Sequence, residues 1–61
     1  MKQFDTVKIT MDNHNEGVTK GQIGTILEVY DDNYFEIEIC DSNGITLFLG
    51  ALSRDFLEAV F

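Results

Sequence analysis

Apolar and polar residues alternate along several short segments of this chain, and a period of two predicts β-strands. The clearest segment is residues 34–41, where Phe35, Ile37 and Ile39 share one face. Strict alternation is typical of a strand with one face in a core and the other in water. Shorter or less regular versions predict four more strands, at residues 4–10, 24–30, 45–50 and 57–60.

Turn-forming residues separate these segments. Residues 42–44, Ser-Asn-Gly, are a strong hairpin signal, and residues 31–33, Asp-Asp-Asn, tolerate the backbone angles of a tight turn. Residues 11–21 are mostly polar, so we expect a long first loop there. Gly21 and Gly24 predict a tight bend that leads into the second strand.

The second strand departs from strict alternation. Ile26, Leu27 and Val29 are all apolar, although neighbouring residues of a strand point to opposite faces. An extra residue near Leu27 and Glu28 would restore the pattern. We therefore predict a β-bulge at this point, which would also help the sheet to bend.

The C-terminal residues allow two predictions. Residues 53–56 fit one helical turn capped by Ser53, after which residues 57–60 return as a strand beside the first strand. The alternative is a continuous C-terminal helix, because the apolar residues here also suit helical spacing. A helix this short is marginal in water, which favours the strand. The sequence thus predicts an all-β fold. We expect one domain, residues 1–61, forming a small five-stranded SH3-like barrel with a long first loop and a short helical turn before the last strand.

The fourth strand has two alternative registers, which bury different residues. A three-residue loop at 42–44 turns Leu47 and Leu49 inward and leaves Phe48 outside, near Glu38. A two-residue loop does the reverse, because a shift of one residue exchanges the two faces of a strand. The first register buries more of the strand, so we expect it. A large apolar side chain then emerges beside an acidic strand in either case.

Charge narrows the classes of partner. The chain has 61 residues, with eleven acidic and four basic side chains and a formal net charge of −7. A surface that binds phosphates needs clustered basic residues to release counterions. The basic residues are few and scattered, so we expect binding neither to nucleic acid nor to a membrane surface. They are Lys2, Lys8, Lys20 and Arg54.

The sequence predicts a cytoplasmic location. Cys40 is the lone cysteine and cannot form an intrachain disulfide, which fits a reducing compartment. The first residues lack the apolar stretch of a signal peptide. No segment approaches the roughly 18 consecutive apolar residues of a membrane helix.

The candidate binding residues lie on the strands predicted around the hairpin. Glu36 and Glu38 share one face of their strand, and Glu28 lies on the neighbouring strand. Like charges side by side across strands are unfavourable, so a basic protein would relieve them. Phe48 is the expected apolar anchor, and Phe4, Tyr30 and Phe61 could add to it. The simpler interpretation is a solvated outer face whose apolar residues the C-terminus covers.

Nothing in the sequence predicts catalysis or a bound cofactor. His14 lies among oxygen ligands, but the spacing does not match a calcium-binding EF-hand loop. The pair Gly21 and Gly24 lacks the lysine and the helix of a phosphate-binding loop. Cys40 and His14 alone make a poor metal site. We predict no catalytic residue, no metal and no cofactor.

The linear pattern resembles the small family of bacterial proteins known as domain of unknown function 4926. The resemblance covers nearly the whole chain and is weakest in the first loop. It implies a barrel similar to KOW domains and to the nitrile-hydratase β-subunit, with no assigned activity and no recognised catalytic residues. Some members lie beside genes for toxin-like proteins, which implies an immunity or antitoxin role. The matching residues are 4–7, 21–30, 34–39, 41–47 and Leu52.

Two functions are consistent with these observations. The first is a non-catalytic, acidic protein-interaction module, of the immunity or antitoxin type, that binds a basic protein through Glu28, Glu36, Glu38 and Phe48. The alternative is a self-assembling structural or accessory subunit, similar to the nitrile-hydratase β barrel, without independent activity. We do not expect an enzyme.

Overall fold

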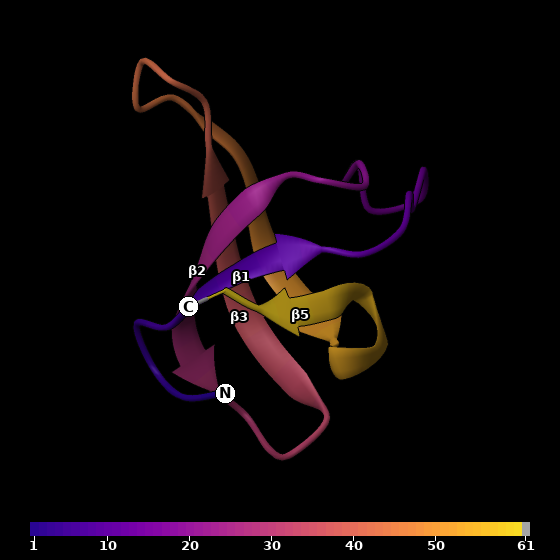
Figure 1. Cartoon of the computed structure of the whole chain (residues 1–61), viewed down its shortest axis with the longest axis vertical. Helices are drawn as coiled ribbons and strands as arrows, with labels where there is room; N and C mark the ends of the chain where they lie inside the picture. The colour runs from indigo at the N-terminus through magenta and orange to yellow at the C-terminus, as the bar shows by residue number, and fades with distance from the viewer. Residues whose placement is uncertain (61) are drawn as a thin grey trace.

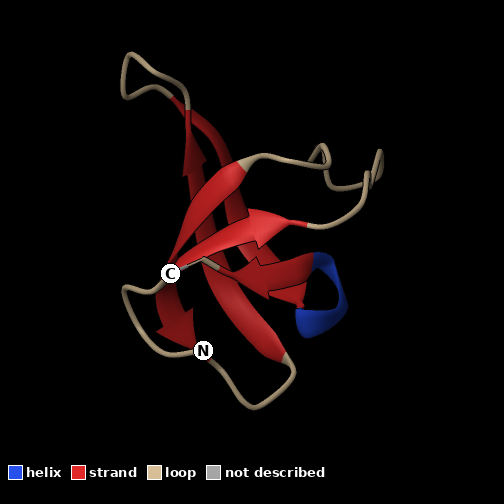
Figure 2. Cartoon of the chain, viewed as in Figure 1, coloured by secondary structure: helices blue, strands red, loops and turns tan. Residues whose placement is uncertain are grey.

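Five antiparallel strands form one curled sheet in the computed structural model, which describes residues 1–60 (Figures 1 and 2). The order across the sheet is β4-β3-β2-β1-β5, so the last strand returns beside the first. In Figure 1, β1 and β5 cross in front of β3 and β4. The predicted all-β fold is confirmed, and the strand order is that of an SH3-like barrel. The elements are β1 (Thr6–Ile9), β2 (Ile23–Val29), β3 (Tyr34–Cys40), β4 (Thr46–Ser53), the 3-10 helix η1 (Arg54–Phe56) and β5 (Leu57–Ala59).

The apolar residues at alternate positions of the strands form most of the core. The inward-facing residues of β3, Phe35, Ile37 and Ile39, are all buried, as the sequence predicts. Removing these side chains from water is the main favourable term for so small a domain. No polar or charged residue is buried among residues 1–60. The core consists of Val7, Ile9, Val18, Ile26, Phe35, Ile37, Ile39, Leu52 and Leu57.

The first loop contributes to the core through one residue. Val18 is 2% exposed, although its neighbours in the loop are polar and exposed. It forms an isolated bridge with Asn13, in which each backbone N–H donates to the other residue's carbonyl. The backbone N–H of Lys20 donates to Asp12 Oδ1 at 2.8 Å. The loop is therefore long, as predicted, but it is fastened to the sheet.

The predicted bulge in β2 is present. The register of β2 against β3 shifts between Ile26 and Glu28, so Leu27 has no partner opposite it. The side-chain amide of Gln3 donates to the Leu27 carbonyl at 3.0 Å. This bond satisfies a backbone group next to the interrupted ladder.

The expected register of β4 is wrong, although the expected loop is right. The hairpin closes at Asp41 and Ile45, whose backbone N–H and carbonyl bond at 2.9 Å, so the loop is residues 42–44. Cys40 then pairs with Thr46, but Ile39 pairs with Phe48 instead of Leu47. The extra residue, Leu47, is a second bulge. It exchanges the two faces of the strand from that point on.

The predicted helical turn and last strand are confirmed, and the alternative C-terminal helix is wrong. Ser53 caps η1 by accepting a hydrogen bond from the backbone N–H of Asp55. The backbone N–H of Thr10, just after β1, donates to the Phe56 carbonyl at 2.9 Å and fastens η1 to the first strand. Among residues 1–60 the one helix is η1, whose three residues are far too few to span a bilayer.

Candidate functional site

The three predicted glutamates lie together on the outer face of the sheet. Glu28 on β2 and Glu36 on β3 are direct cross-strand partners. Glu38 lies two residues along β3 on the same face, because side chains alternate. We call this set, Glu28, Glu36 and Glu38, the acidic face. The sheet thus brings together the carboxylates that the sequence placed on neighbouring strands.

Two of these carboxylates are oriented by hydroxyl donors. The Tyr30 hydroxyl donates to Glu36 Oε1 at 2.9 Å, and the Thr46 hydroxyl donates to Glu38 Oε2 at 3.1 Å. Hydroxyl groups hold a carboxylate in place but leave its charge uncompensated. The acidic face is therefore both ordered and negative.

The neighbouring Glu36 changes the pKa of Tyr30. The hydrogen bond to Glu36 raises the pKa of the Tyr30 phenol, with smaller contributions from desolvation and from the negative charges of Glu36 and Glu28. A phenolate would lose the bond to the carboxylate and add another negative charge beside it. From the sequence, Tyr30 is expected only to add to the exposed apolar surface. Its place two residues beyond Glu28, close to a strand that carries Glu36, was the available signal.

Phe48 does not lie on the acidic face, so the outward position expected for it beside Glu38 is wrong. It is half-buried, packs against the core, and pairs with inward-facing Ile39. A Cβ placed on Gly50 would lie 3.1 Å from Phe48 Cζ, so the ring covers this glycine. Because Leu47 bulges out of the ladder instead of pairing with Ile39, Phe48 turns inward.

Leucines take the exposed place that Phe48 was expected to fill. Leu47 and Leu49 on β4 are 54% and 57% exposed, and Ile45 just before the strand is 61% exposed. Leu49 is the cross-strand partner of Glu38, so it borders the acidic face. We call Ile45, Leu47 and Leu49 the apolar edge. Phe4 and Tyr30 are also exposed, whereas Phe61 lies outside the described residues.

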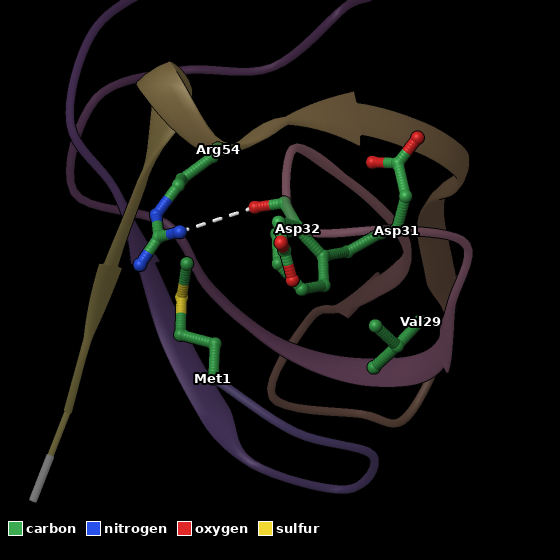
Figure 3. A pocket seen from close by; sticks show the side chains of 6 residues that line it. Met1, Val29, Asp31, Asp32 and Arg54 are labelled. Carbon is green, nitrogen blue, oxygen red and sulfur yellow. Dashed lines mark hydrogen bonds between the residues drawn. The ribbon is translucent and has the colours of Figure 1, made fainter.

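A small hollow opens at the end of the barrel beside η1 (Figure 3). Its volume is about 180 Å³, below the roughly 300 Å³ at which small-molecule sites begin. Arg54 Nη1 donates to the Asp32 carbonyl at 3.1 Å, and Asp31 Oδ1 accepts from two backbone N–H groups of its own turn. The Arg54 bond joins the β2–β3 turn to η1, and the Asp31 bonds hold the turn itself. The lining residues are Met1, Val29, Asp31, Asp32, Phe35 and Arg54.

The remaining polar candidates are dispersed. His14 is exposed in the first loop, and Cys40 is an exposed free thiol at the end of β3. Within residues 1–60, no group of three or more His, Cys, Asp or Glu side chains could hold a metal ion. The acidic face with the apolar edge is thus the most distinctive surface of the described chain.

Comparison with protein-family models gives a match over residues 3–59 to the family described as "Domain of unknown function (DUF4926)". The chain belongs to the DUF4926 family. The match spans all five strands, so the acidic face and the apolar edge both lie within the DUF4926 domain. Neither the curated proteins nor the solved structures gave a match.

Proposed function

We propose that this DUF4926 domain is a non-catalytic protein-interaction module of the immunity or antitoxin type. Its acidic face receives a basic protein partner. The observation that carries the proposal is the grouping of three glutamates on one outer face, with Glu28 directly opposite Glu36. Like charges opposite one another cost roughly 0.2–1 kcal/mol, and a bound cation would relieve that cost.

The negative charge of this surface speeds its encounter with a basic protein. A net charge of −7 attracts a basic protein over several ångströms and speeds the encounter. The apolar edge, which borders Glu38 through Leu49, then supplies the water-excluding contact. We place the protein in the cytoplasm, where the exposed thiol of Cys40 stays reduced.

The test starts by capturing proteins from the native host at low salt and eluting them with rising salt. The association rate of the captured partner is then measured with a variant in which Glu28, Glu36 and Glu38 are changed to Gln. We expect roughly tenfold slower association and a weaker dependence on salt. Capture of neutral or acidic proteins only would contradict the proposal.

A matched variant removes three negative charges from other parts of the surface. The substitutions are Glu16→Gln in the first loop, Asp55→Asn in η1 and Glu58→Gln on β5, and all three residues are exposed. Their combined effect on net charge equals that of the acidic-face variant. Equal association rates for the two variants would show that net charge alone acts, and would exclude the acidic face as the binding site.

Self-assembly as a structural subunit is the second candidate. The exposed leucines of β4 favour it, since apolar side chains at a sheet edge are prone to pair with another copy. Sedimentation of the isolated protein tests it. A dimer that dissociates on Leu49→Asp would support self-assembly, and a monomer at all concentrations would exclude it.

A further inference from the structure

One edge of the sheet is long and unpaired. β4 is at the end of the strand order and pairs only with β3 among the described residues. It has eight residues, whereas β5 at the opposite edge has three. An edge strand presents a row of backbone N–H and carbonyl groups that another strand can pair with.

This edge lacks most of the features that block such pairing. Proteins protect edge strands with lysine, proline, inward-pointing charges, bulges or short length. The residues of β4, Thr-Leu-Phe-Leu-Gly-Ala-Leu-Ser, include no charged residue and no proline. Its one irregularity lies near Leu47, which leaves the stretch from Leu49 to Ser53 in regular register with β3.

We propose that the edge of β4, from Leu49 to Ser53, binds an extended segment of the partner as an added strand. This inference rests on the proposed function, because the acidic face selects the chemistry of the segment. That segment alternates basic and apolar residues. Backbone pairing supplies affinity, and alternate side chains supply specificity.

The side chains beside this edge explain the alternation. The outer positions of β4 are Leu49 and Ala51, which pair with Glu38 and Glu36 respectively. Neighbouring strands are about 4.8 Å apart, so the glutamates are two strands away from an added segment. Long basic side chains can lay their apolar stems across Leu49 and Ala51 and bring their charges towards the carboxylates.

Charge also argues against a second copy as the occupant. Pairing of two β4 edges would join two chains of net charge −7 and bring their acidic faces into one continuous surface. A basic segment removes that repulsion. The charge of the molecule therefore favours a foreign, basic strand at this edge.

The experiment uses fluorescent ten-residue peptides of alternating Lys and Val, with binding to the whole protein followed by fluorescence anisotropy. One peptide is unmodified, a second is N-methylated on every Lys, and a third on every Val. The N–H groups of alternate residues point to the same edge of a strand. One methylated peptide should therefore bind at least about tenfold more weakly, from the loss of two or more hydrogen bonds. The other should bind within about twofold of the unmodified peptide.

Two protein variants complete the test. Leu49→Thr should weaken binding of the unmodified peptide several-fold, while Ile23→Thr, a similar change at an exposed position of β2, should not. Equal binding of all three peptides would overturn strand addition. So would failure of the unmodified peptide to bind, or dimerisation of the protein through β4 in its place.

The same peptides distinguish this inference from the proposed function. If only one methylated peptide loses affinity but Glu36→Gln and Glu38→Gln bind as tightly as the parent, the edge pairs with strands and the acidic face is not used. If those variants weaken binding while all three peptides bind alike, the acidic face stands and strand addition is wrong.

Discussion

Gly24 shows how one missing methyl group shapes this sheet. It lies in β2 opposite Ile39 and is buried, and its lack of a side chain leaves room for those of Ile37 and Ile39. A Cβ at this position would lie 2.9 Å from Ile37 Cγ2 and 3.0 Å from the Glu38 carbonyl oxygen. The nearby Gly21 has a different role, since its φ of 95° is a backbone conformation that glycine adopts without strain.

Gly24→Ala should therefore destabilise the fold by about 1–3 kcal/mol, because the backbone of β3 cannot move aside without disturbing its own pairing. Urea denaturation measures the change in the free energy of unfolding. Thr25→Ala, at the next position, changes an outer residue and serves as the control. A loss below about 0.5 kcal/mol for Gly24→Ala would mean that the two strands separate easily.

The Tyr30–Glu36 pair gives a prediction about pH. The hydrogen bond to Glu36 holds the pKa of Tyr30 above its ordinary value, so the neutral phenol is favoured in the folded state. The resulting stability is present below the pKa of the unfolded chain and is lost as the pH rises through the higher pKa of the folded protein. NMR titration of the Tyr30 ring should show this raised pKa, and Glu36→Gln should lower it. An unchanged titration in Glu36→Gln would place the cause elsewhere.

At the scale of elements, the β3–β4 hairpin depends on one extra residue. Leu47 separates the pair Cys40–Thr46 from the pair Ile39–Phe48. Without it, the ladder would run regularly, with Phe48 still opposite Ile39. A chain without this residue would keep Phe48 and the rest of β4 on their present faces and would lose only one exposed leucine.

Deletion of Leu47 should accordingly keep the fold, with a change in unfolding free energy of about 1 kcal/mol or less. An NOE between the Phe48 ring and the Ile39 methyl groups would show that the pairing persists. Deletion of Leu49 is the matched comparison. It would turn Leu52 outward and should cost several kcal/mol, since a buried leucine is lost from the core. Equal costs for the two deletions would contradict this account of the bulge.

Elements with local signals could be predicted from the sequence. The alternation in β3, the bulge beside Leu27 and the Ser53 cap each follow from a few adjacent residues. The register of β4 could not, because both alternatives bury large apolar residues. The bulge at Leu47, which no local pattern marks, sets the register, and the Phe48 ring then lies over Gly50, two residues away on the inner face. The candidate site was predicted to the same extent: the glutamates were placed correctly and Phe48 was not.

Across the whole molecule, negative charge opposes the compact state. Eleven acidic and four basic side chains share a very small surface, and Glu28 faces Glu36 directly. Repulsion among exposed charges weakens as salt shortens the distance over which they act. Stability should therefore depend on ionic strength.

Raising NaCl from about 20 mM to about 200 mM should stabilise the fold by about 0.5 kcal/mol, because the Debye length falls by about threefold. Thermal or urea unfolding at each salt concentration measures this gain. Glu28→Gln should begin more stable at low salt and gain less. A gain as large in Glu28→Gln as in the parent would mean that the repulsion is spread over the surface and not centred on the acidic face.

The bridge between Asn13 and Val18 closes residues 14–17 into a small loop. Val18 anchors one end of this loop in the core, and the loop projects away from the sheet (Figure 1). Because the four residues between the bridged pair contribute nothing to the core, a short epitope or a fluorophore inserted there should leave the barrel intact. This small loop is accordingly a suitable place to attach a label for imaging the domain in living cells.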